Sequence, residues 1–406
     1  MLKCGLLGEK LGHSYSPQIH SMLADYEYKL FEKSPEELES FLISGDFDGI
    51  NVTIPYKKAV MPYCAELSDT AKQIGSVNTI VRRSDGSLFG DNTDAFGFEN
   101  LILHKGIEVK GKKALVLGTG GASVTAQAVL RKLGASVVVI SRKGENNYDN
   151  IAKHSDAQII ANTTPVGMYP NNGKAAVDLS LFHGLCGVLD VVYNPARTAL
   201  LMQAERLGIP CAGGLYMLVS QAKRSSELFT GAPIDDSEID RIGRVLSRDM
   251  ENIVLIGMPG SGKTTVARLL SEKTGRKVLD IDEMIVERAG MSIPEIFAQG
   301  GEAGFRKLET ELISDAGKGS GAIIATGGGC VTVDRNYALL HQNGVIVWLQ
   351  RNTDSLPRDG RPLSATADLH EMYRRRVPLY EAFADITADN NGTPEACADS
   401  IWRQLA

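Results

Sequence analysis

Apolar residues along this chain form short continuous runs, separated by longer stretches with helical periodicity. The runs at 113–117, 136–140 and 345–349 are rich in aliphatic and β-branched side chains, which is typical of strands buried in a parallel sheet. The stretches between runs place apolar residues three or four positions apart and so predict helices. Strands that alternate with helices indicate an α/β fold. The further predicted strands are 2–7, 158–161, 188–193, 252–256, 277–281, 322–326 and one that begins at Gly49 and stops at Pro55.

The composition fits a globular protein of the cytoplasm. With 406 residues, the chain has room for two or three domains of about 150 residues each. Its net charge of -6 and the lack of a long basic run argue against nucleic acid as a partner. No apolar run approaches the ~20 residues of a membrane span. The cysteines stand singly, without a C-x-x-C pair, so we expect free thiols in a reducing cytosol. Composition leaves the oligomeric state open between monomer and homodimer.

A glycine-rich motif at 257–264 lies between a predicted strand and a predicted helix. Its sequence, G-M-P-G-S-G-K-T, matches G-x-x-x-x-G-K-[ST]. In such a loop the backbone N–H groups surround phosphate oxygens, the lysine reaches the terminal phosphates and the threonine can hold Mg²⁺. We therefore predict an ATP site, with a plain strand-to-helix turn as the alternative. The predicted nucleotide-binding residues are Gly257, Gly260, Ser261, Gly262, Thr264 and Thr265, together with a catalytic Lys263, and Thr264 is also a predicted metal ligand.

Polar residues in the first 95 positions follow predicted strands or open predicted helices. Ser16 precedes a proline and a helix, so we interpret it as an N-cap, while Ser14 stays open between capping and binding a small carboxylate. Lys57 lies just past a strand end, where open α/β sheets place their sites, although a solvated lysine is the ordinary interpretation. Asp94 falls in the first turn of a predicted helix, where the helix dipole alone favours a carboxylate.

Four motifs in this region, taken together, resemble those of shikimate dehydrogenase. They are G-H-S-Y-S-P at 12–17, N-V-T-I-P-Y-K at 51–57, S-V-N-T at 76–79 and D-N-T-D at 91–94. The resemblance implies that Ser14 and Ser16 bind the substrate carboxylate, that Thr53, Asn78, Lys57 and Asp94 contact the ring hydroxyls, and that Lys57 and Asp94 form the acid/base pair. Hydride addition to a ketone leaves an alkoxide, and a lysine held by a carboxylate can supply its proton without a metal.

A second glycine loop lies between the predicted strands 113–117 and 136–140. It reads G-x-G-G-A-S, and Ser123 stands where the G-x-G-x-x-G motif has its third glycine. The order strand, loop, helix, strand predicts a Rossmann unit. The second strand is followed by Arg142 and Lys143, where an acidic residue would select NAD, so we predict NADP, with exposed surface charge as the alternative. The predicted cofactor-binding residues are Gly118, Gly120, Gly121, Ala122, Arg142 and Lys143.

The resemblance to shikimate dehydrogenase extends to about residue 245. It implies that Thr163 lines the nicotinamide side, that Gly214 and Met217 lie near the cofactor, and that Tyr193 and Gln221 touch the substrate. From spacing alone, Met217 is an ordinary core residue. The stretch 143–157 is shorter than the family usually has, so we expect a curtailed Rossmann helix. The expected domains are a substrate-binding domain at 1–96 and 212–245, a Rossmann NADP domain at 97–211, a short linker at 246–251 and a P-loop domain at 252–406.

The second half of the chain places charged residues after predicted strands and on predicted helices. Asp280 and Asp282 suit Mg²⁺ handling and activation of a hydroxyl, with helix capping as the alternative for one of them. Arg306 and Glu309 share one helix face, where a structural ion pair is the alternative. Three glycines at 327–329 indicate a close approach of a ligand to the backbone.

With the P-loop, these motifs resemble those of shikimate kinase. The set is G-M-P-G-S-G-K-T, D-I-D, F-R-K-L-E, G-G-G, R-P-L and R-V-P-L-Y, in that order. The resemblance implies that Asp280 helps to place Mg²⁺, that Asp282 acts as the base, that Arg306, Gly328 and Arg376 bind the substrate carboxylate, and that Arg361 on a mobile lid steadies the transferring phosphoryl group. Taken alone, the arginine triplet at 374–376 would be a solvated helix face. The stretch 349–361 is several residues shorter than the family norm, so the lid geometry departs from the pattern.

These observations predict a fused enzyme with a dehydrogenase half and a kinase half. The resemblances imply NADPH-dependent reduction of 3-dehydroshikimate to shikimate, followed by phosphorylation of shikimate by Mg-ATP. One alternative is a quinate-using dehydrogenase fused to another small-molecule kinase. Another is a nucleotide-gated regulator without turnover, against which the intact Lys57, Asp94, Lys263 and Asp282 argue.

Overall fold

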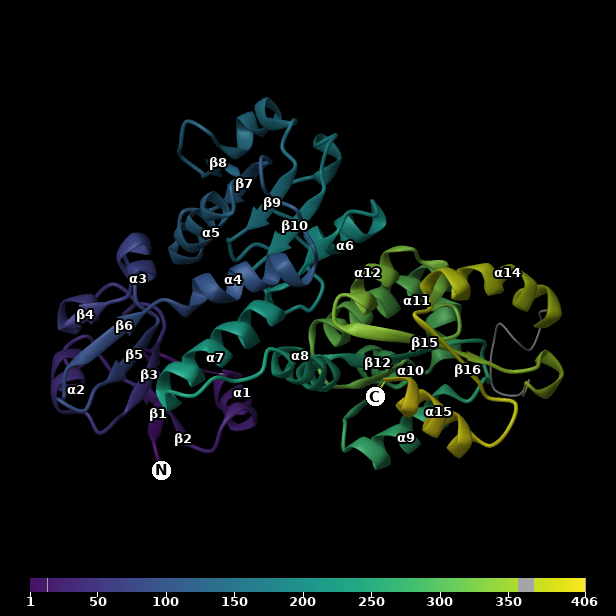
Figure 1. Cartoon of the computed structure of the whole chain (residues 1–406). Coiled ribbons are helices and arrows are strands. Elements are labelled where there is room, and N and C mark those ends of the chain that lie inside the picture. Colours follow the sequence, from purple (N-terminus) through teal and green to yellow (C-terminus); the bar gives the residue numbers. More distant parts are fainter. Residues whose placement is uncertain (13, 357–368, 406) are drawn as a thin grey trace. The chain divides into compact units, whose positions relative to one another are not determined.

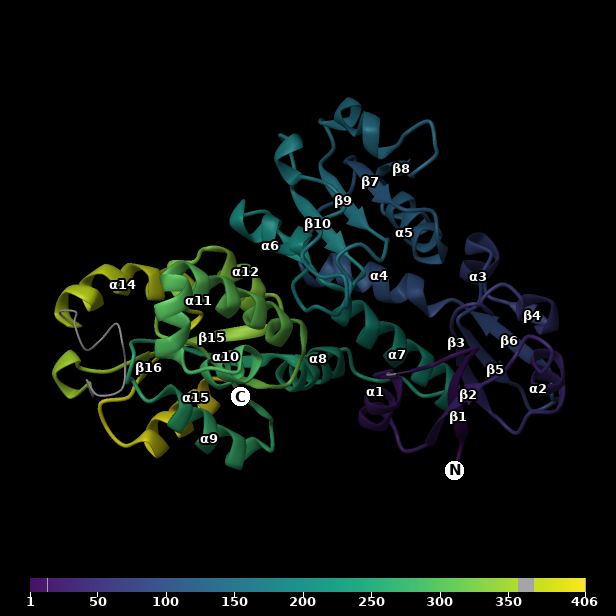
Figure 2. The ribbon, with the colours of Figure 1, turned by 180° about the vertical axis from the view of Figure 1, so that it is seen from behind.

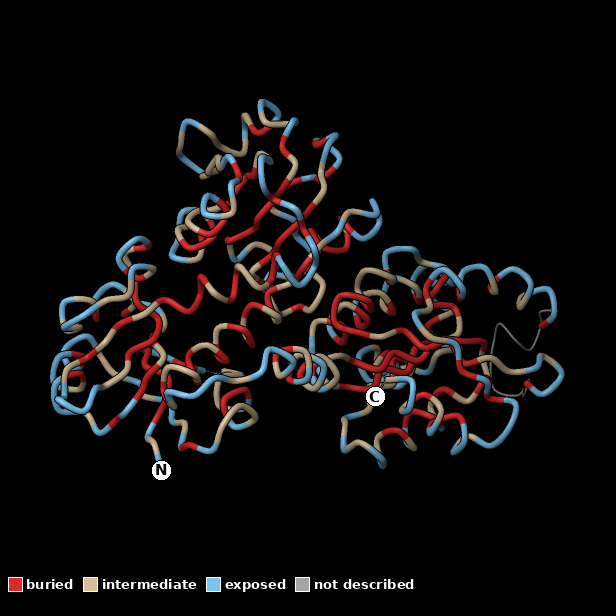
Figure 3. The backbone as a smooth tube through the Cα atoms, in the orientation of Figure 1, coloured by how far each residue is buried: buried red, intermediate tan, exposed pale blue. Residues whose placement is uncertain are grey.

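A computed structural model describes residues 1–12, 14–356 and 369–405 (Figure 1). The chain forms two compact units. The first comprises Met1–Gly167, Lys174–Tyr193 and Gln203–Val245, and the second comprises Met168–Gly173, Asn194–Met202 and Leu246–Ala406. Figure 3 shows that buried positions concentrate on the strands, as expected for sheets covered by helices. Among the residues that the structure describes, no helix is long and apolar enough to cross a membrane.

The first unit contains a six-stranded mixed sheet with strand order β2-β1-β3-β5-β6-β4. The β3–β5 and β5–β6 pairs are antiparallel and the other pairs are parallel. Leu7, Ile50 and Ile80 from three neighbouring strands are fully buried and form its apolar core. The strands are β1 (Lys3–Gly8), β2 (Glu27–Glu32), β3 (Gly49–Val52), β4 (Glu66–Leu67), β5 (Thr79–Arg82) and β6 (Leu88–Asp91), and the helices are α1 (Ser16–Leu23), α2 (Leu38–Ser44), η1 (Met61–Tyr63) and α3 (Asp69–Ile74).

The same unit contains a second, fully parallel sheet with strand order β11-β10-β9-β7-β8. The predicted strands 113–117 and 136–140 are confirmed to the residue. The short stretch after β8 forms only the 3-10 helix η2, which confirms the expected curtailed helix. The strands are β7 (Lys113–Leu117), β8 (Ser136–Ile140), β9 (Ile159–Asn162), β10 (Gly187–Asp190) and β11 (Cys211–Ala212), and the helices are α5 (Gly121–Lys132), η2 (Tyr148–His154) and η3 (Leu179–Leu181). The helix α6 (Ala199–Arg206) has its first four residues in the second unit and the rest in the first.

Two long helices of the first unit, α4 (Thr93–His104) and α7 (Gly214–Thr230), pack side by side (Figures 1 and 2). The contact is close, because a Cβ built at Gly97 would lie 2.6 Å from the carbonyl oxygen of Met217. A side chain at position 97 would therefore push the helices apart. The predicted linker at 246–251 is helical up to Met250, since it forms the last turns of α8 (Ser237–Met250).

The second unit is built on a parallel five-stranded sheet with strand order β13-β14-β12-β15-β16. One apolar cluster packs α10, α11, α12 and α14 against the sheet, and a second packs α9 and α15 against it. The strands are β12 (Asn252–Ile256), β13 (Val278–Asp280), β14 (Ile323–Ala325), β15 (Gly344–Gln350) and β16 (Ile386–Asp389). The helices are α9 (Lys263–Thr274), α10 (Ile281–Ala289), α11 (Ile293–Lys318), η4 (Cys330–Thr332), α12 (Arg335–His341), η5 (Thr353–Ser355), α14 (Leu369–Phe383) and α15 (Pro394–Leu405).

Candidate active sites

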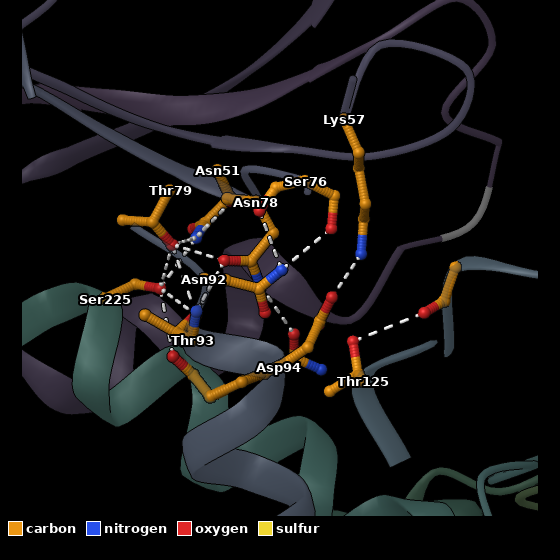
Figure 4. A network of polar contacts seen from close by, with 12 residues as sticks. Asn51, Lys57, Ser76, Asn78, Thr79, Asn92, Thr93, Asp94, Thr125 and Ser225 are labelled. Atoms are coloured by element: carbon orange, nitrogen blue, oxygen red, sulfur yellow. Dashed lines mark hydrogen bonds and ion pairs between the residues drawn. The ribbon is translucent and has the colours of Figure 1, made fainter. Parts of the chain in front are cut away.

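The first candidate site is centred on an ion pair between Lys57 and Asp94 (Figure 4). Lys57 follows β3, and Asp94 is the second residue of α4. The Lys57 Nζ donates to the Asp94 Oδ2 over 2.5 Å, and the two side chains are 26% and 11% exposed. The dipole of α4 favours a carboxylate in its first turn. The structure thus pairs the two groups that the sequence could also explain separately, and it leaves part of the lysine accessible.

Asn78 and Gln221 lie together in the same unit. The Asn78 side-chain amide nitrogen donates to the Gln221 Oε1 over 3.4 Å, while its oxygen accepts the backbone N–H of Thr93 over 2.7 Å. Asn78 directly precedes β5, and Gln221 is on α7. Thr53 follows β3 directly, and its backbone N–H donates to the carbonyl oxygen of Leu7 over 2.9 Å. Hydrogen bonds therefore hold Asn78 to Gln221 and to the start of α4, and Thr53 to β1.

The prediction that Ser16 is the N-cap of its helix is wrong. Ser16 is the first helical residue, Tyr15 is at the N-cap position without a capping side chain, and the Ser14 Oγ instead accepts the backbone N–H of Ser16 over 3.2 Å. The motif starts its helix one residue earlier than expected, because Ser14 supplies the local acceptor. The Tyr15 ring meets the edge of the predicted substrate residue Tyr193, with centroids 6.1 Å apart. His13 lies outside the described residues.

The loop after β7 has the shape expected for a dinucleotide. Gly118 has a φ of 107°, which favours glycine, and a Cβ there would lie 2.9 Å from Thr164 Cγ2. Gly120 and Gly121 face open space, so the backbone there is accessible to a phosphate at the start of α5. The departure at Ser123 is explained by its buried hydroxyl, which donates to the carbonyl oxygen of Gly118 over 2.7 Å. These features fit NADP binding. Ala122 lies in the first turn of α5.

The other predicted cofactor residues divide between the surface and the core. Arg142 and Lys143 are exposed directly after β8, where a 2′-phosphate could meet them. Thr163 is buried and donates its hydroxyl to the carbonyl oxygen of Leu117 over 2.6 Å. Gly214 opens α7, and a Cβ there would lie 2.1 Å from the backbone oxygen of Val191. Met217 is buried in an apolar cluster, as its spacing alone indicated.

The second candidate site surrounds the loop between β12 and α9. Gly257, Gly260 and Gly262 have positive φ values of 146°, 81° and 95°, which only glycine adopts readily. The Lys263 Nζ lies inside the loop and donates to the carbonyl oxygens of Gly257 and Met258 over 2.9 and 3.0 Å. A glycine-rich loop of this conformation with an enclosed ammonium fits the phosphates of a nucleoside triphosphate. Ser261 is buried in the loop, and Thr265 is exposed in the first turn of α9.

Oxygen ligands suited to magnesium lie beside this loop. The Thr264 hydroxyl donates to the Asp280 Oδ2 over 2.8 Å. The other oxygen of Asp280 accepts the backbone N–H groups of Asp282 and Glu283, so Asp280 is also the N-cap of α10. Hydroxyl and carboxylate oxygens are the ligands that Mg²⁺ prefers, and the donor set therefore fits this ion.

The glycine turn at 327–329 gathers two carboxylates. A Cβ at Gly327 would lie 2.5 Å from the Glu309 Oε1 and 3.0 Å from the Asp282 Oδ1. Glu309 is fully buried and accepts the Arg306 Nη1 over 2.6 Å. Burial raises the pKa of Glu309, and the arginine opposes this shift. The ion pair expected from the sequence is therefore part of the site itself.

Two arginines reach the same turn from different helices. A Cβ at Gly329 would lie 2.0 Å from the Arg306 Nη2, and the Arg376 Nη1 donates to the carbonyl oxygen of Gly328 over 3.1 Å. Arg376 is 9% exposed, whereas Arg374 and Arg375 are exposed. The solvated-face interpretation of the triplet is therefore wrong for Arg376, because its side chain is buried and bonded to the glycine turn. Arg361 and the R-P-L motif lie outside the described residues.

Sequence reasoning missed several groups that support these residues. The Thr79 hydroxyl donates to the Asn78 side-chain oxygen and is in contact with the Ser225 hydroxyl. In the other unit, Tyr380 donates its hydroxyl to the Gly328 carbonyl oxygen over 2.5 Å. The available signal for Ser225 was its position one helical turn after Gln221.

Comparison with known proteins relates the two parts of the chain to two different protein families. The family model of the shikimate dehydrogenase substrate-binding domain matches residues 6–80, and that of shikimate kinase matches residues 259–406. The NADP(+)-dependent shikimate dehydrogenase of Clostridium beijerinckii is 36% identical over 253 residues, which are 57% of this chain and 93% of that protein.

Two solved structures are similar to the same part of the chain. A chorismate mutase/shikimate 5-dehydrogenase fusion protein from Clostridium acetobutylicum has a TM-score of 0.57 and 36% identity, over 60% of this chain and 97% of that chain. A quinate dehydrogenase from Corynebacterium glutamicum, in complex with NAD, has a TM-score of 0.56 and 27% identity, over 60% of this chain and 98% of that chain. The chain therefore belongs to the shikimate dehydrogenase family and carries a shikimate kinase domain at its C-terminal end.

Proposed function

We propose that this chain is a bifunctional enzyme of the shikimate pathway. Its first half reduces 3-dehydroshikimate to shikimate with NADPH, and its second half phosphorylates shikimate with ATP and Mg²⁺. The observation that carries the proposal is the presence of two groups of reactive side chains: the Lys57–Asp94 pair in one unit, and Lys263 with Thr264–Asp280 in the other.

In the dehydrogenase site, the chain's own residues supply the proton and the orientation. NADPH, bound at the loop that follows β7, supplies the hydride. As the ketone is reduced, its oxygen would take up the carbonyl π electrons, and the Lys57 ammonium would give a proton to that oxygen. Asp94 accepts a hydrogen bond from Lys57 over 2.5 Å and keeps the ammonium aimed at one place. Ser14 and Ser16 bind the carboxylate of the substrate, and Asn78 and Gln221 bind its ring hydroxyls.

In the kinase site, positioning and charge neutralisation carry most of the catalysis. Mg-ATP supplies the phosphoryl group. Asp282 takes the proton of the attacking ring hydroxyl, whose oxygen bonds to the γ-phosphorus as the bond to the bridging oxygen of ADP breaks. Lys263 neutralises the phosphate oxygens, and Arg306 and Arg376 hold the carboxylate of shikimate beside Gly328. Arg361 is proposed to steady the transferring group.

The domain boundaries and cellular setting belong to the same proposal. We assign substrate binding to 1–96 and 212–245, NADP binding to 97–211 and the kinase to 252–406. The family-model matches at 6–80 and 259–406 fall inside the first and the last of these ranges and support them. A cytoplasmic location is supported by the use of NADPH and ATP in small-molecule biosynthesis. The oligomeric state, monomer or homodimer, is measured directly by light scattering coupled to size-exclusion chromatography.

One reaction mixture tests both activities. The purified chain is given 3-dehydroshikimate, NADPH and Mg-ATP, and mass spectrometry should detect shikimate 3-phosphate. The variant Lys57→Ala should stop the route at the ketone, whereas Lys263→Ala should let shikimate accumulate. The proposal fails if the unmodified chain binds both nucleotides and yet forms neither product.

One observation makes quinate an alternative substrate of the first half. The similarity to a solved quinate dehydrogenase, at 27% identity over 60% of this chain, leaves quinate as a competing alcohol. Quinate and shikimate are therefore compared for NADP⁺ reduction at equal concentration. We expect shikimate to give the higher kcat/KM, and a preference for quinate would reassign the dehydrogenase.

A further inference from the structure

A cluster of three buried hydroxyls lies behind the dehydrogenase site (Figure 4). It consists of Thr79 on β5, Thr93 at the start of α4 and Ser225 on α7, each at most 1% exposed. The oxygens of Thr79 and Ser225 are 2.9 Å apart, those of Thr93 and Ser225 are 3.0 Å apart, and those of Thr79 and Thr93 are 3.1 Å apart. Three hydroxyls in mutual contact inside a core form a connected network, so the loss of one affects the others.

This cluster fixes the orientation of the Asn78 amide. The backbone N–H of Thr93 lies 2.7 Å from one polar atom of the amide, and because a backbone N–H can only donate, that atom is the oxygen. The hydroxyls of Thr79 and Thr93 reach the same oxygen over 3.1 and 3.2 Å. The NH₂ group of Asn78 therefore points the other way, toward the Gln221 Oε1 at 3.4 Å.

The same cluster holds the helix that carries Gln221. The Ser225 hydroxyl lies 2.9 Å from the Gln221 carbonyl oxygen, one turn earlier on α7, and it accepts the side-chain amide of Asn51 on β3 over 2.7 Å. Asn51 in turn accepts the Tyr28 hydroxyl over 2.8 Å. Hydrogen bonds thus join α7 to β3, β5 and the start of α4, the elements from which Asn78, Asp94 and the loop bearing Lys57 extend.

We propose that Thr79 and Ser225 are positioning residues of the dehydrogenase site, and that they present Asn78 to the substrate as a hydrogen-bond donor. The site then recognises a ring hydroxyl through that hydroxyl's oxygen. Neither residue touches the substrate, and each acts through Asn78 or Gln221. This inference rests on the proposed dehydrogenase function of the first half.

The test measures KM for shikimate and for NADP⁺ separately in the full chain. Thr79→Val removes a hydroxyl at nearly constant volume, and Ser225→Ala removes the other. We expect each variant to raise KM for shikimate about tenfold, while KM for NADP⁺ and the kinase rate of the same sample change less than twofold. Thr79→Ser keeps the hydroxyl and should restore KM for shikimate to within threefold of the unmodified enzyme.

Ser220→Ala is the matched control. Ser220 is a fully buried serine on the same helix that takes no part in this cluster, so its variant should leave KM for shikimate unchanged. A merely structural role would lower thermal stability in all three alanine or valine variants without a selective change in KM. Equal changes in both KM values, or no change in either variant, would overturn the inference.

The donor assignment has its own test. Asn78→Asp puts an acceptor oxygen where the NH₂ group lies, so we expect KM for shikimate to rise at least 100-fold. If Asn78→Asp binds shikimate as well as the unmodified enzyme, Asn78 is not a donor. Shikimate oxidation by the unmodified chain is measured first. Its absence would refute the proposed function, whereas an active chain with unaffected Thr79 and Ser225 variants would refute only this inference.

Discussion

A methyl group at Gly329 should disable substrate binding by the kinase while leaving its fold intact. A Cβ there would lie 2.0 Å from the Arg306 Nη2 and 2.6 Å from its Cζ. Ordinary carbon contacts are about 3.5 Å or longer, so the guanidinium must move by about 1.5 Å. Gly329 has a φ of -110°, which alanine adopts freely, and the obstructed group is the end of a long side chain rather than backbone. The backbone therefore keeps its conformation while Arg306 moves, and the loosened ion pair with the buried Glu309 lowers the stability of the kinase unit without unfolding it.

The size of the effect follows from the interaction that is lost. A hydrogen bond to a charged group contributes about 1.5–3 kcal/mol, which corresponds to roughly a 10- to 100-fold weaker interaction. We expect Gly329→Ala to raise KM for shikimate by that factor at saturating Mg-ATP, with KM for ATP nearly unchanged. ADP release is followed in a coupled assay, and the dehydrogenase rate of the same sample normalises the amount of folded chain.

Gly328→Ala is the comparison variant. A Cβ there would lie 2.6 Å from the Pro259 Cδ and 2.7 Å from its backbone nitrogen, so it would disturb the P-loop and raise KM for both substrates. If Gly329→Ala leaves KM for shikimate unchanged, or raises KM for ATP equally, Arg306 does not hold the substrate.

Three further outcomes are expected. Lys57→Met should lower dehydrogenase kcat by about 10²- to 10⁴-fold, because Asp94 alone cannot supply the proton, and leave the kinase rate unchanged. Burial lowers the pKa of His20 from 6.5 to about 3, so its NMR signals should not titrate between pH 5 and 8. The unfolded chain takes up that proton as the pH falls below 6.5, so the stability from the neutral imidazole declines toward pH 3, by about 2 kcal/mol at pH 5. Gly214→Ala places a Cβ 2.1 Å from the Val191 oxygen, so it should shift α7, lower thermal stability by about 1–3 kcal/mol and raise the dehydrogenase KM for shikimate, but not the kinase KM.

The sequence predicted those features that local chemistry determines. β7 and β8 are continuous aliphatic runs, and their bounds were predicted to the residue. β7 lies inside the parallel sheet and is almost entirely buried, so it has no polar face, whereas β8 is the edge strand and is only partly buried. The P-loop was predicted because its glycines, lysine and threonine are all adjacent in sequence. The ends of helices and strands were predicted less accurately than their positions. β3 stops at Val52 rather than Pro55, because its length is set by pairing with β1 and β5.

Contacts between distant residues could not be predicted from spacing. Ser225 and Asn51 are 174 positions apart, and a serine on the buried face of a helix has the same pattern as a small packing residue. Spacing alone did not single out Arg376 either, since three consecutive arginines carry no indication of which one turns inward, and it was named only through the resemblance to shikimate kinase. In both cases the missing information is the tertiary position of a helix face, which periodicity alone does not supply.

Asp280 shows why structural and functional interpretations of one residue need not compete. Its two carboxylate oxygens have different partners. One accepts backbone N–H groups at the start of α10, and the other accepts the Thr264 hydroxyl over 2.8 Å. The cap fixes the carboxylate in one orientation, and this orientation places the second oxygen beside the P-loop threonine. In the proposed magnesium site the cap has a second role, because a freely rotating carboxylate would lose conformational entropy on binding an ion, whereas the capping carboxylate is already held in one orientation. By the same reasoning, a polar side chain at a strand end that caps a helix and also bonds a neighbouring loop is a strong candidate for a functional residue.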